Sequence, residues 1–182
     1  MNYASIKKYD IANGPGVRMS LFVSGCTHRC KNCFNKETWD PKYGDKFTEK
    51  EEKDIIQSLS PSYISGLSVL GGDPFCYDNA RHVAMFLQKV KRAYPNKSIW
   101  VYTGYTLENL IRIIENSQDR MGISYEYDLL KNVDVLVDGP FIEDLKNLRL
   151  KFRGSSNQRL IDIQKTLFNK DNRSMNIVLY DV

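Results

Sequence analysis

Three cysteines in one short segment are the residues of this 182-residue chain best suited to chemistry. Cys26, Cys30 and Cys33 lie in the segment 23–34, VSGCTHRCKNCF, with the spacing C-x3-C-x2-C. Cysteines this close are too cramped for an unstrained disulfide framework, and an odd number cannot pair completely. The spacing therefore indicates thiolate ligands of one metal centre.

The number of ligands bears on which metal centre this is. A structural zinc site closes its tetrahedron with four protein ligands. His28 lies between two of the cysteines, where it reaches the same ion poorly, and Cys76 has the character of a small buried hydrophobe, as free cysteines commonly do. Three thiolates favour a 4Fe-4S cluster with one iron left open for a small molecule. A zinc site in a non-enzymatic binding module is the alternative.

Composition limits the architecture and the partners. With 182 residues and 42% hydrophobic content, the chain buries one good core, so we expect a single domain over residues 1–182. The mean hydropathy of -0.45 and the lack of a long apolar run predict a cytoplasmic protein with no membrane partner. An excess of 26 basic over 22 acidic residues is too small and scattered to indicate nucleic-acid binding.

Short apolar runs alternate with helical patterns along the chain. The runs predict strands at 19–24, 66–70, 98–103 and 133–137, with a possible late strand at 176–180. Helices are predicted to begin at Thr48, at Asp78 and at Thr106, and the first has the capping-box partner Glu51. This alternation predicts an α/β fold with a curved, mainly parallel sheet, in the form of a compact partial (β/α) barrel with the cysteine loop after its first strand.

Each predicted strand ends in a chemically unusual segment. The cysteine loop follows the first strand, and GGDP, TGY and DGP follow the next three, at 71–74, 103–105 and 138–140. Ligands of parallel α/β folds bind at the carboxyl ends of the strands. We therefore expect these segments to converge on one site, whereas the stripe Trp100 and Tyr102 is predicted to belong to the core.

The motifs together resemble those of a known family. C-x3-C-x2-C after a first strand is the pattern of radical S-adenosylmethionine (SAM) enzymes. Over about the first 160 residues the chain is similar to the activating proteins of the anaerobic ribonucleoside-triphosphate reductase. The resemblance is carried by NGPG (13–16) with Arg18, LFVSGC (21–26), CFNKETW (33–39), GGDP, TGY, VDVLVDGPF (133–141) and RGSSNQR (153–159).

The resemblance implies a radical mechanism. Cys26, Cys30 and Cys33 would hold a 4Fe-4S cluster, and the amino and carboxylate groups of SAM would bind its open iron. Reductive cleavage of SAM would give a 5'-deoxyadenosyl radical, which removes a hydrogen atom from a glycine of the reductase. The implied partners are the large glycyl radical subunit of the reductase and an electron donor such as flavodoxin.

The resemblance also implies contacts to SAM at the strand ends. Gly71 and Gly72 would let the backbone approach SAM closely, and Asp73 would offer its carboxylate to the ammonium group, with the Gly72 backbone as the alternative. Asp73 stands where many relatives have glutamate, and Asn32 stands where many have an aromatic residue against adenine. The adenine would then contact the backbone of the segment Asn32, Cys33 and Phe34, and the Phe34 ring would pack either on adenine or in the core. The remaining candidates for the same cavity are Thr103, Tyr105 and Asp138.

Two other radical SAM activities compete with this interpretation. One is activation of pyruvate formate-lyase, and the other is a small-molecule reaction of deazapurine synthesis. The short chain and the lack of a second cysteine cluster favour the reductase activator.

Overall fold

The computed structural model describes residues 1–76, 79–117, 124–167 and 176–182. The strands are β1 (Asn2–Asp10), β2 (Val17–Val23), β3 (Asp45–Lys46), β4 (Ile64–Gly71), β5 (Ser98–Tyr102), β6 (Val135–Asp138) and β7 (Arg159–Asp162). The α-helices are α1 (Glu49–Ser58), α2 (Asn79–Ala93), α3 (Leu107–Ser117), α4 (Tyr125–Lys131) and α5 (Ile163–Leu167). Two short 3-10 helices are η1 (Lys36–Trp39) and η2 (Glu143–Leu145).

The strands form one mixed sheet in the order β3-β1-β2-β4-β5-β6-β7. The pairs from β2 through β4 and β5 to β6 are parallel, and β1, β3 and β7 join antiparallel. The α/β fold with a parallel centre is therefore confirmed, and the arrangement is consistent with a partial barrel. In the described part of the chain, no helix is long and apolar enough to cross a membrane.

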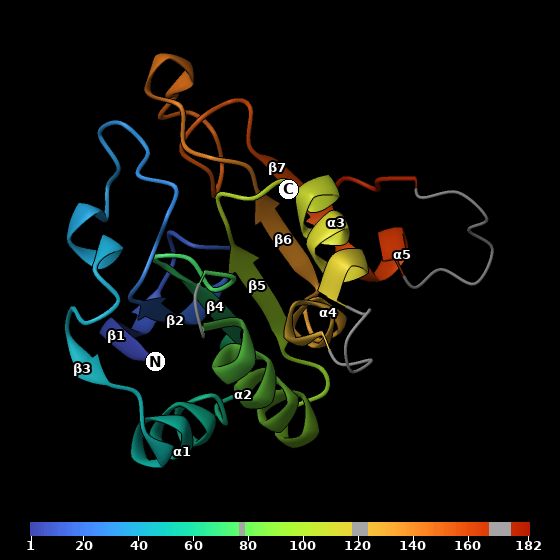
Figure 1. Cartoon of the computed structure of the whole chain (residues 1–182). Helices are drawn as coiled ribbons and strands as arrows, with labels where there is room; N and C mark the ends of the chain where they lie inside the picture. Colours follow the sequence, from blue (N-terminus) through green and yellow to red (C-terminus); the bar gives the residue numbers. More distant parts are fainter. Residues whose placement is uncertain (77–78, 118–123, 168–175) are drawn as a thin grey trace.

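The two faces of the sheet bury different kinds of side chain. Side chains alternate between the faces along each strand, and Met19, Leu21 and Val23 of β2 pack into the main hydrophobic core with the apolar sides of the helices. Helices α1, α2, α3 and α4 lie along this side of the sheet (Figure 1). The other face of the sheet, which we call the inner face, is available to build a site.

Arg18 fills the inner face near the amino ends of the strands. Its side chain is fully buried, and its Nε donates a hydrogen bond to Ser68 Oγ at 2.8 Å. The two terminal nitrogens donate to Ser98 Oγ and to the carbonyl oxygens of Leu67 and Ser98. The guanidinium lies 5.5 Å from the ring of Trp100. This layer forms a floor that leaves the carboxyl ends of the strands open.

The predicted strands and helices correspond to β2, β4, β5, β6, α1, α2 and α3 with small shifts at their ends. Asp78, the predicted first residue of the second helix, lies outside the described residues. The possible strand at 176–180 is reduced to an isolated bridge between Ile161 and Leu179. β1 was not predicted, because its polar sequence NYASIKKYD leaves most of its side chains at least partly exposed on this outer part of the sheet.

The capping box of α1 gives a direct test of the fold. Thr48 Oγ1 accepts a hydrogen bond from the Lys50 N–H, and the Glu51 carboxylate accepts one from the Thr48 N–H at 2.9 Å. We expect Thr48→Ala to lower the free energy of unfolding by about 1 kcal/mol, because helix N–H groups lose their partner. Thr48→Ser, which keeps the hydroxyl, is the control in chemical denaturation. Equal loss in both variants would contradict the role of the cap.

Candidate cluster and cofactor site

A cavity of about 520 Å³ opens at the carboxyl ends of the parallel strands. Each of the predicted strand-end segments contributes to its lining. The contributing residues are Cys26, Cys30 and Cys33 after β2, Gly71, Gly72 and Asp73 after β4, Thr103 and Gly104 after β5, and Gly139 after β6. The expected convergence on one site is therefore confirmed, and it follows from the parallel arrangement of β2, β4, β5 and β6.

The cysteine loop is held in shape by its backbone. The Gly25 N–H donates to the Thr38 carbonyl at 2.7 Å and the Cys26 N–H to the Trp39 carbonyl at 3.2 Å, so η1 fixes the start of the loop. Arg29 and Asn32 take left-handed backbone conformations, with φ of 49° and 53°. Cys26 is buried, Cys30 and Cys33 are half-buried, and all three thiols are free. The Asn35 N–H points at Cys33 Sγ at 3.4 Å, a contact that stabilises a thiolate.

Asp73 links the cysteine loop to the ends of β4 and β5. Its carboxylate is 1% exposed and accepts hydrogen bonds from His28 Nε2, the Phe75 N–H and the Gly104 N–H, each at 2.8 Å. Thr103 Oγ1 lies 3.0 Å and 2.9 Å from the two carboxylate oxygens. Both oxygens accept from these donors, so Asp73 holds the cysteine loop and the ends of β4 and β5 together, and its predicted contact with an ammonium group stays a prediction.

His28 is the part of the cysteine loop that reaches Asp73. Its ring packs edge-on against Tyr105, with 4.4 Å between centroids, and lies on Gly104, where an added Cβ would stand 2.4 Å from the ring. Burial lowers the pKa of His28, but the hydrogen bonds with Asp73 and Cys76 outweigh it and raise the pKa to about 9. The charged imidazolium thus faces the Asp73 carboxylate.

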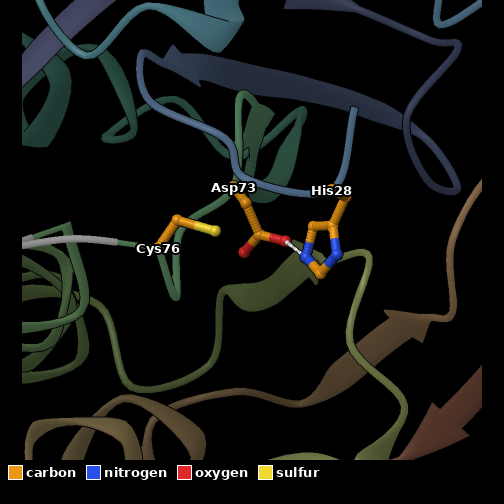
Figure 2. Close-up of side chains that lie close together, drawn as sticks. All are labelled: His28, Asp73 and Cys76. Atoms are coloured by element: carbon orange, nitrogen blue, oxygen red, sulfur yellow. Dashed lines mark hydrogen bonds and ion pairs between the residues drawn. The ribbon is translucent and has the colours of Figure 1, made fainter. Parts of the chain in front are cut away.

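Cys76 lies on the other side of Asp73 from the His28 ring (Figure 2). Its thiol is buried, as predicted, but it also contacts Thr27 Oγ1 at 3.2 Å. The hydrogen bond with Cys26, together with that from His28, lowers the pKa of Cys76. The ligand atoms of His28, Asp73 and Cys76 lie within 4.8 Å of one another. Because the Asp73 oxygens are already bonded to N–H and O–H groups, we interpret this group as a hydrogen-bonded cluster.

The glycines of GGDP allow the backbone of this segment to pack directly against the backbone at the end of β2 and the start of the cysteine loop. A Cβ on Gly72 would stand 2.5 Å from the Gly25 carbonyl oxygen, and one on Gly71, whose φ is 109°, 2.7 Å from the Val23 carbonyl oxygen. The Gly72 N–H donates to the Val23 carbonyl, and the Asp73 N–H to the Gly25 carbonyl. Side chains here would push GGDP away from the cysteine loop.

Other predicted site residues divide into those at the cavity and those behind it. Phe34 lines the cavity, packs on Phe141 with 5.0 Å between centroids and is 60% exposed, so its alternative role as a core anchor is wrong. Thr103 also lines the cavity. Asn32 does not, because its side chain bonds to Glu143 at the surface. Tyr105 lies behind His28, and burial raises its pKa to about 12.

Asp138 is also not at the cavity. It is fully buried, accepts a hydrogen bond from the Leu107 N–H at the start of α3 at 2.8 Å, and pairs with Arg159. Arg159 also makes two hydrogen bonds to Glu108. The carboxylate therefore joins β6, β7 and α3, and its expected contact with the cofactor does not follow from this placement.

Some lining residues were missed or misassigned from the sequence. Tyr102 packs against the cluster around Trp100, as predicted, but it also lines the cavity, whereas Trp100 is fully buried. Phe152 and Arg153 come from the loop between β6 and β7. The alternation of β5 predicts that Trp100 and Tyr102 lie on the same face. Nothing in the sequence indicated that Trp100 lies in the buried layer with Arg18 while Tyr102 lies at the cavity.

Comparison with known proteins decides the family. A family model described as "4Fe-4S single cluster domain" matches residues 12–161. The chain is 39% identical over 160 residues to the anaerobic ribonucleoside-triphosphate reductase-activating protein of Enterobacteria phage T4, covering 88% of this chain and 93% of that protein. The proteins of the same name from Vibrio cholerae and Escherichia coli K12 are 43% and 41% identical, each over 87% of this chain and 96% of their own length. The chain belongs to this family of activating proteins.

The chain belongs to the reductase-activator family, so the zinc-binding module is excluded. The family match also gives no support to activation of pyruvate formate-lyase or to deazapurine synthesis. The chain has a 4Fe-4S domain of the radical SAM type. Its cavity fits such a group, because three free thiols line it. The 4Fe-4S cluster and SAM are thus the cofactors of this domain.

The contact between His28 and Asp73 predicts a titration. In protein prepared without the cluster, we expect His28 to titrate near pH 9, against 6.5 for an ordinary histidine, and Asp73→Asn to return it toward 6.5. The stabilisation of the folded state by the charged His28 is complete below pH 6.5 and is lost as the pH rises through 9. That loss is about 3 kcal/mol.

Nuclear magnetic resonance and denaturation at several pH values measure both effects. The chain has two histidines, so His82→Gln assigns the His28 signal and serves as the control that keeps the pH dependence. A His28 pKa that is the same with and without the Asp73 charge would contradict the assignment.

Proposed function

We propose that this chain activates the anaerobic ribonucleoside-triphosphate reductase by generating a glycyl radical on it. The observation that carries the proposal is the meeting of three free cysteines with the other strand-end segments at one cavity. The relatives are about 40% identical to this chain, the similarity covers nearly their whole length, and they are named for this activity. The proposal brings that named activity to this chain.

The cluster ligands in this proposal are Cys26, Cys30 and Cys33. When bound, the cluster would supply the electron for reductive cleavage of SAM, which would allow a hydrogen atom to be removed from the target glycine. Cys26 is the most buried of the three and is fixed by η1, so it anchors the loop. Cys30 and Cys33 lie closer to the mouth of the cavity, on a turn in which the Cys33 N–H donates to the Cys30 carbonyl.

The chain itself binds and orients SAM. We assign the ammonium contact to the backbone at Gly71 and Gly72, because the Asp73 oxygens are occupied by other donors. Phe34 offers an exposed ring at the cavity for adenine, flanked by Phe141. Asp73, Thr103 and His28 keep these segments in register, and the apolar lining excludes water from the reacting centre.

Three further features belong to the proposal. The electron comes from a donor such as flavodoxin. The chain works as one domain over residues 1–182, which is supported by a sheet that joins strands from near both ends of the chain. The cytoplasm is its compartment, because a reducing environment keeps the cysteines available as ligands.

The activity is tested by anaerobic reconstitution with iron and sulfide. Reduced protein with SAM should give 5'-deoxyadenosine, and added reductase should acquire the electron paramagnetic resonance signal of a glycyl radical. Reduced flavodoxin in place of a chemical reductant tests the donor. Pyruvate formate-lyase is the control target and should acquire no radical. The proposal is wrong if the reductase shows no glycyl radical signal although the cluster is present and SAM is cleaved.

The ligand assignment is tested one cysteine at a time. We expect Cys26→Ala, Cys30→Ala and Cys33→Ala each to abolish 5'-deoxyadenosine formation and to lower the bound iron, because each removes a thiolate from the cluster. Cys76→Ala is the matched control and should keep the visible absorption of the cluster. Loss of the cluster in Cys76→Ala alone would transfer a ligand role to Cys76.

A further inference from the structure

Two buried polar groups on the cavity wall lack hydrogen-bond partners among the described residues. They are the hydroxyl of Tyr102 and the Nε–H of Arg153, and both residues line the cavity. A buried donor without a partner costs free energy that folding has to offset. Such groups in a cavity wall indicate a ligand that supplies the missing acceptor.

Tyr102 and Arg153 lie on the inner side of the strand ends. Tyr102 precedes Thr103 in the chain and shares the inner face of β5 with Trp100, the ring that covers Arg18 in the floor. Phe152 packs on Trp100 with 5.5 Å between ring centroids, which brings the adjacent Arg153 to the same region. Gly154, next to Arg153, lies against the Phe34 ring, where an added Cβ would stand 3.3 Å from it, so the pair lies beside the segments proposed for SAM.

The backbone is strained at Phe152, the residue before Arg153. Phe152 has a φ of 57°, a left-handed conformation that is rare for an aromatic residue. The Arg153 Nη1–H donates to the Gln158 carbonyl at 2.9 Å, and Gln158 Oε1 accepts from the Gly154 N–H at 2.9 Å. These contacts fix the guanidinium, while its Nε–H has no partner in the part of the chain that the structure describes. Strain of this kind is typical of functional sites.

The charge of the lining favours an oxygen acceptor. Lys7 and Arg153 bring positive charge to the cavity, and among the described lining residues Asp73 is the one carboxylate. Its oxygens are already bonded to His28, Thr103 and backbone N–H groups. Burial raises the pKa of Tyr102, so its hydroxyl remains a donor. This part of the wall thus presents donors, and the one carboxylate among the described lining residues is already bonded.

The cavity also extends between two segments from opposite halves of the sheet. Ala12 and Asn13 belong to the connection between β1 and β2, and Leu148 and Phe152 belong to the loop between β6 and β7. Leu148 is 88% exposed although it lines the cavity. An apolar mouth of this kind suits an extended polypeptide, whose carbonyl groups need donors once they are buried.

We propose that Tyr102 and Arg153 form the binding site for the target polypeptide, donating hydrogen bonds to a carbonyl or carboxylate oxygen beside its reacting glycine. The inference rests on the proposed function and adds where the partner binds. Both donor atoms are buried in the free protein, so the polypeptide reaches them once neighbouring side chains of the wall move aside, and the new hydrogen bonds then place the glycine against SAM.

The test uses the full chain with its reconstituted cluster. Tyr102→Phe removes one hydroxyl without removing any hydrogen bond among the described residues, and Arg153→Lys keeps the charge but removes the Nε–H. The controls are Tyr180→Phe, the other tyrosine-ring change beside Trp100, and Arg112→Lys on the exposed side of α3. The probes are SAM, the reductase, and a labelled synthetic peptide that spans its radical glycine.

We expect Tyr102→Phe and Arg153→Lys each to raise the KM for the reductase and the Kd for the peptide about tenfold. The Kd for SAM and the formation of 5'-deoxyadenosine without reductase should stay at the wild-type level, as should every value for the controls.

Three results would overturn the inference: unchanged peptide affinity in Tyr102→Phe, an equal loss in the matched controls, or a loss of SAM affinity, which would place the acceptor on SAM. If Arg153→Lys fails to fold, Tyr102→Phe alone decides. A wild-type protein that cleaves SAM but leaves the reductase without a radical would instead refute the proposed function.

Discussion

The buried carboxylate of Asp73 is the interaction on which the site depends. Taking an ionised carboxylate out of water costs several kcal/mol unless donors replace the water. Here the replacement comes from His28 in the cysteine loop, from the Phe75 N–H after β4, and from Thr103 and Gly104 after β5. A loop that moved away would leave the charge underbonded. The free energy that keeps Asp73 satisfied therefore also holds these segments together.

The short side chain of aspartate suits this role. Its Oδ1 accepts a hydrogen bond from the N–H of Phe75, two residues further along the chain, and this bond closes a turn directly after β4. The same turn brings Gly72 within contact of Gly25, where neither residue has a side chain to intervene. One substitution in GGDP would thus disturb both the cysteine loop and the end of β5. The motif is a packing unit as much as a binding surface.

The sequence predicted the parts of the molecule that depend on local patterns. The cysteine spacing, the apolar runs of the parallel strands and the capping box at Thr48 each follow from a few neighbouring residues, and the parallel topology then brings the strand ends together. The polar strand β1, second from the edge of the sheet, escaped prediction because it lacks an apolar run. Asp138 ends β6 and Asp73 follows β4, but their partners Arg159 and His28 come from distant segments. Sequence spacing does not show such partners.

Departures from local conformational rules are concentrated around the cavity. Among the described residues, the non-glycine positions with left-handed φ are Arg29 and Asn32 in the cysteine loop and Phe152 in the opposite wall. Natural chains agree with local preferences except where function requires otherwise. The strain in the cysteine loop presents thiols to the cavity, and the strain at Phe152 aims Arg153 at the same space. A rigid sheet with a hydrogen-bonded Arg18 floor offsets both, because it fixes the strand ends between which these two loops are held.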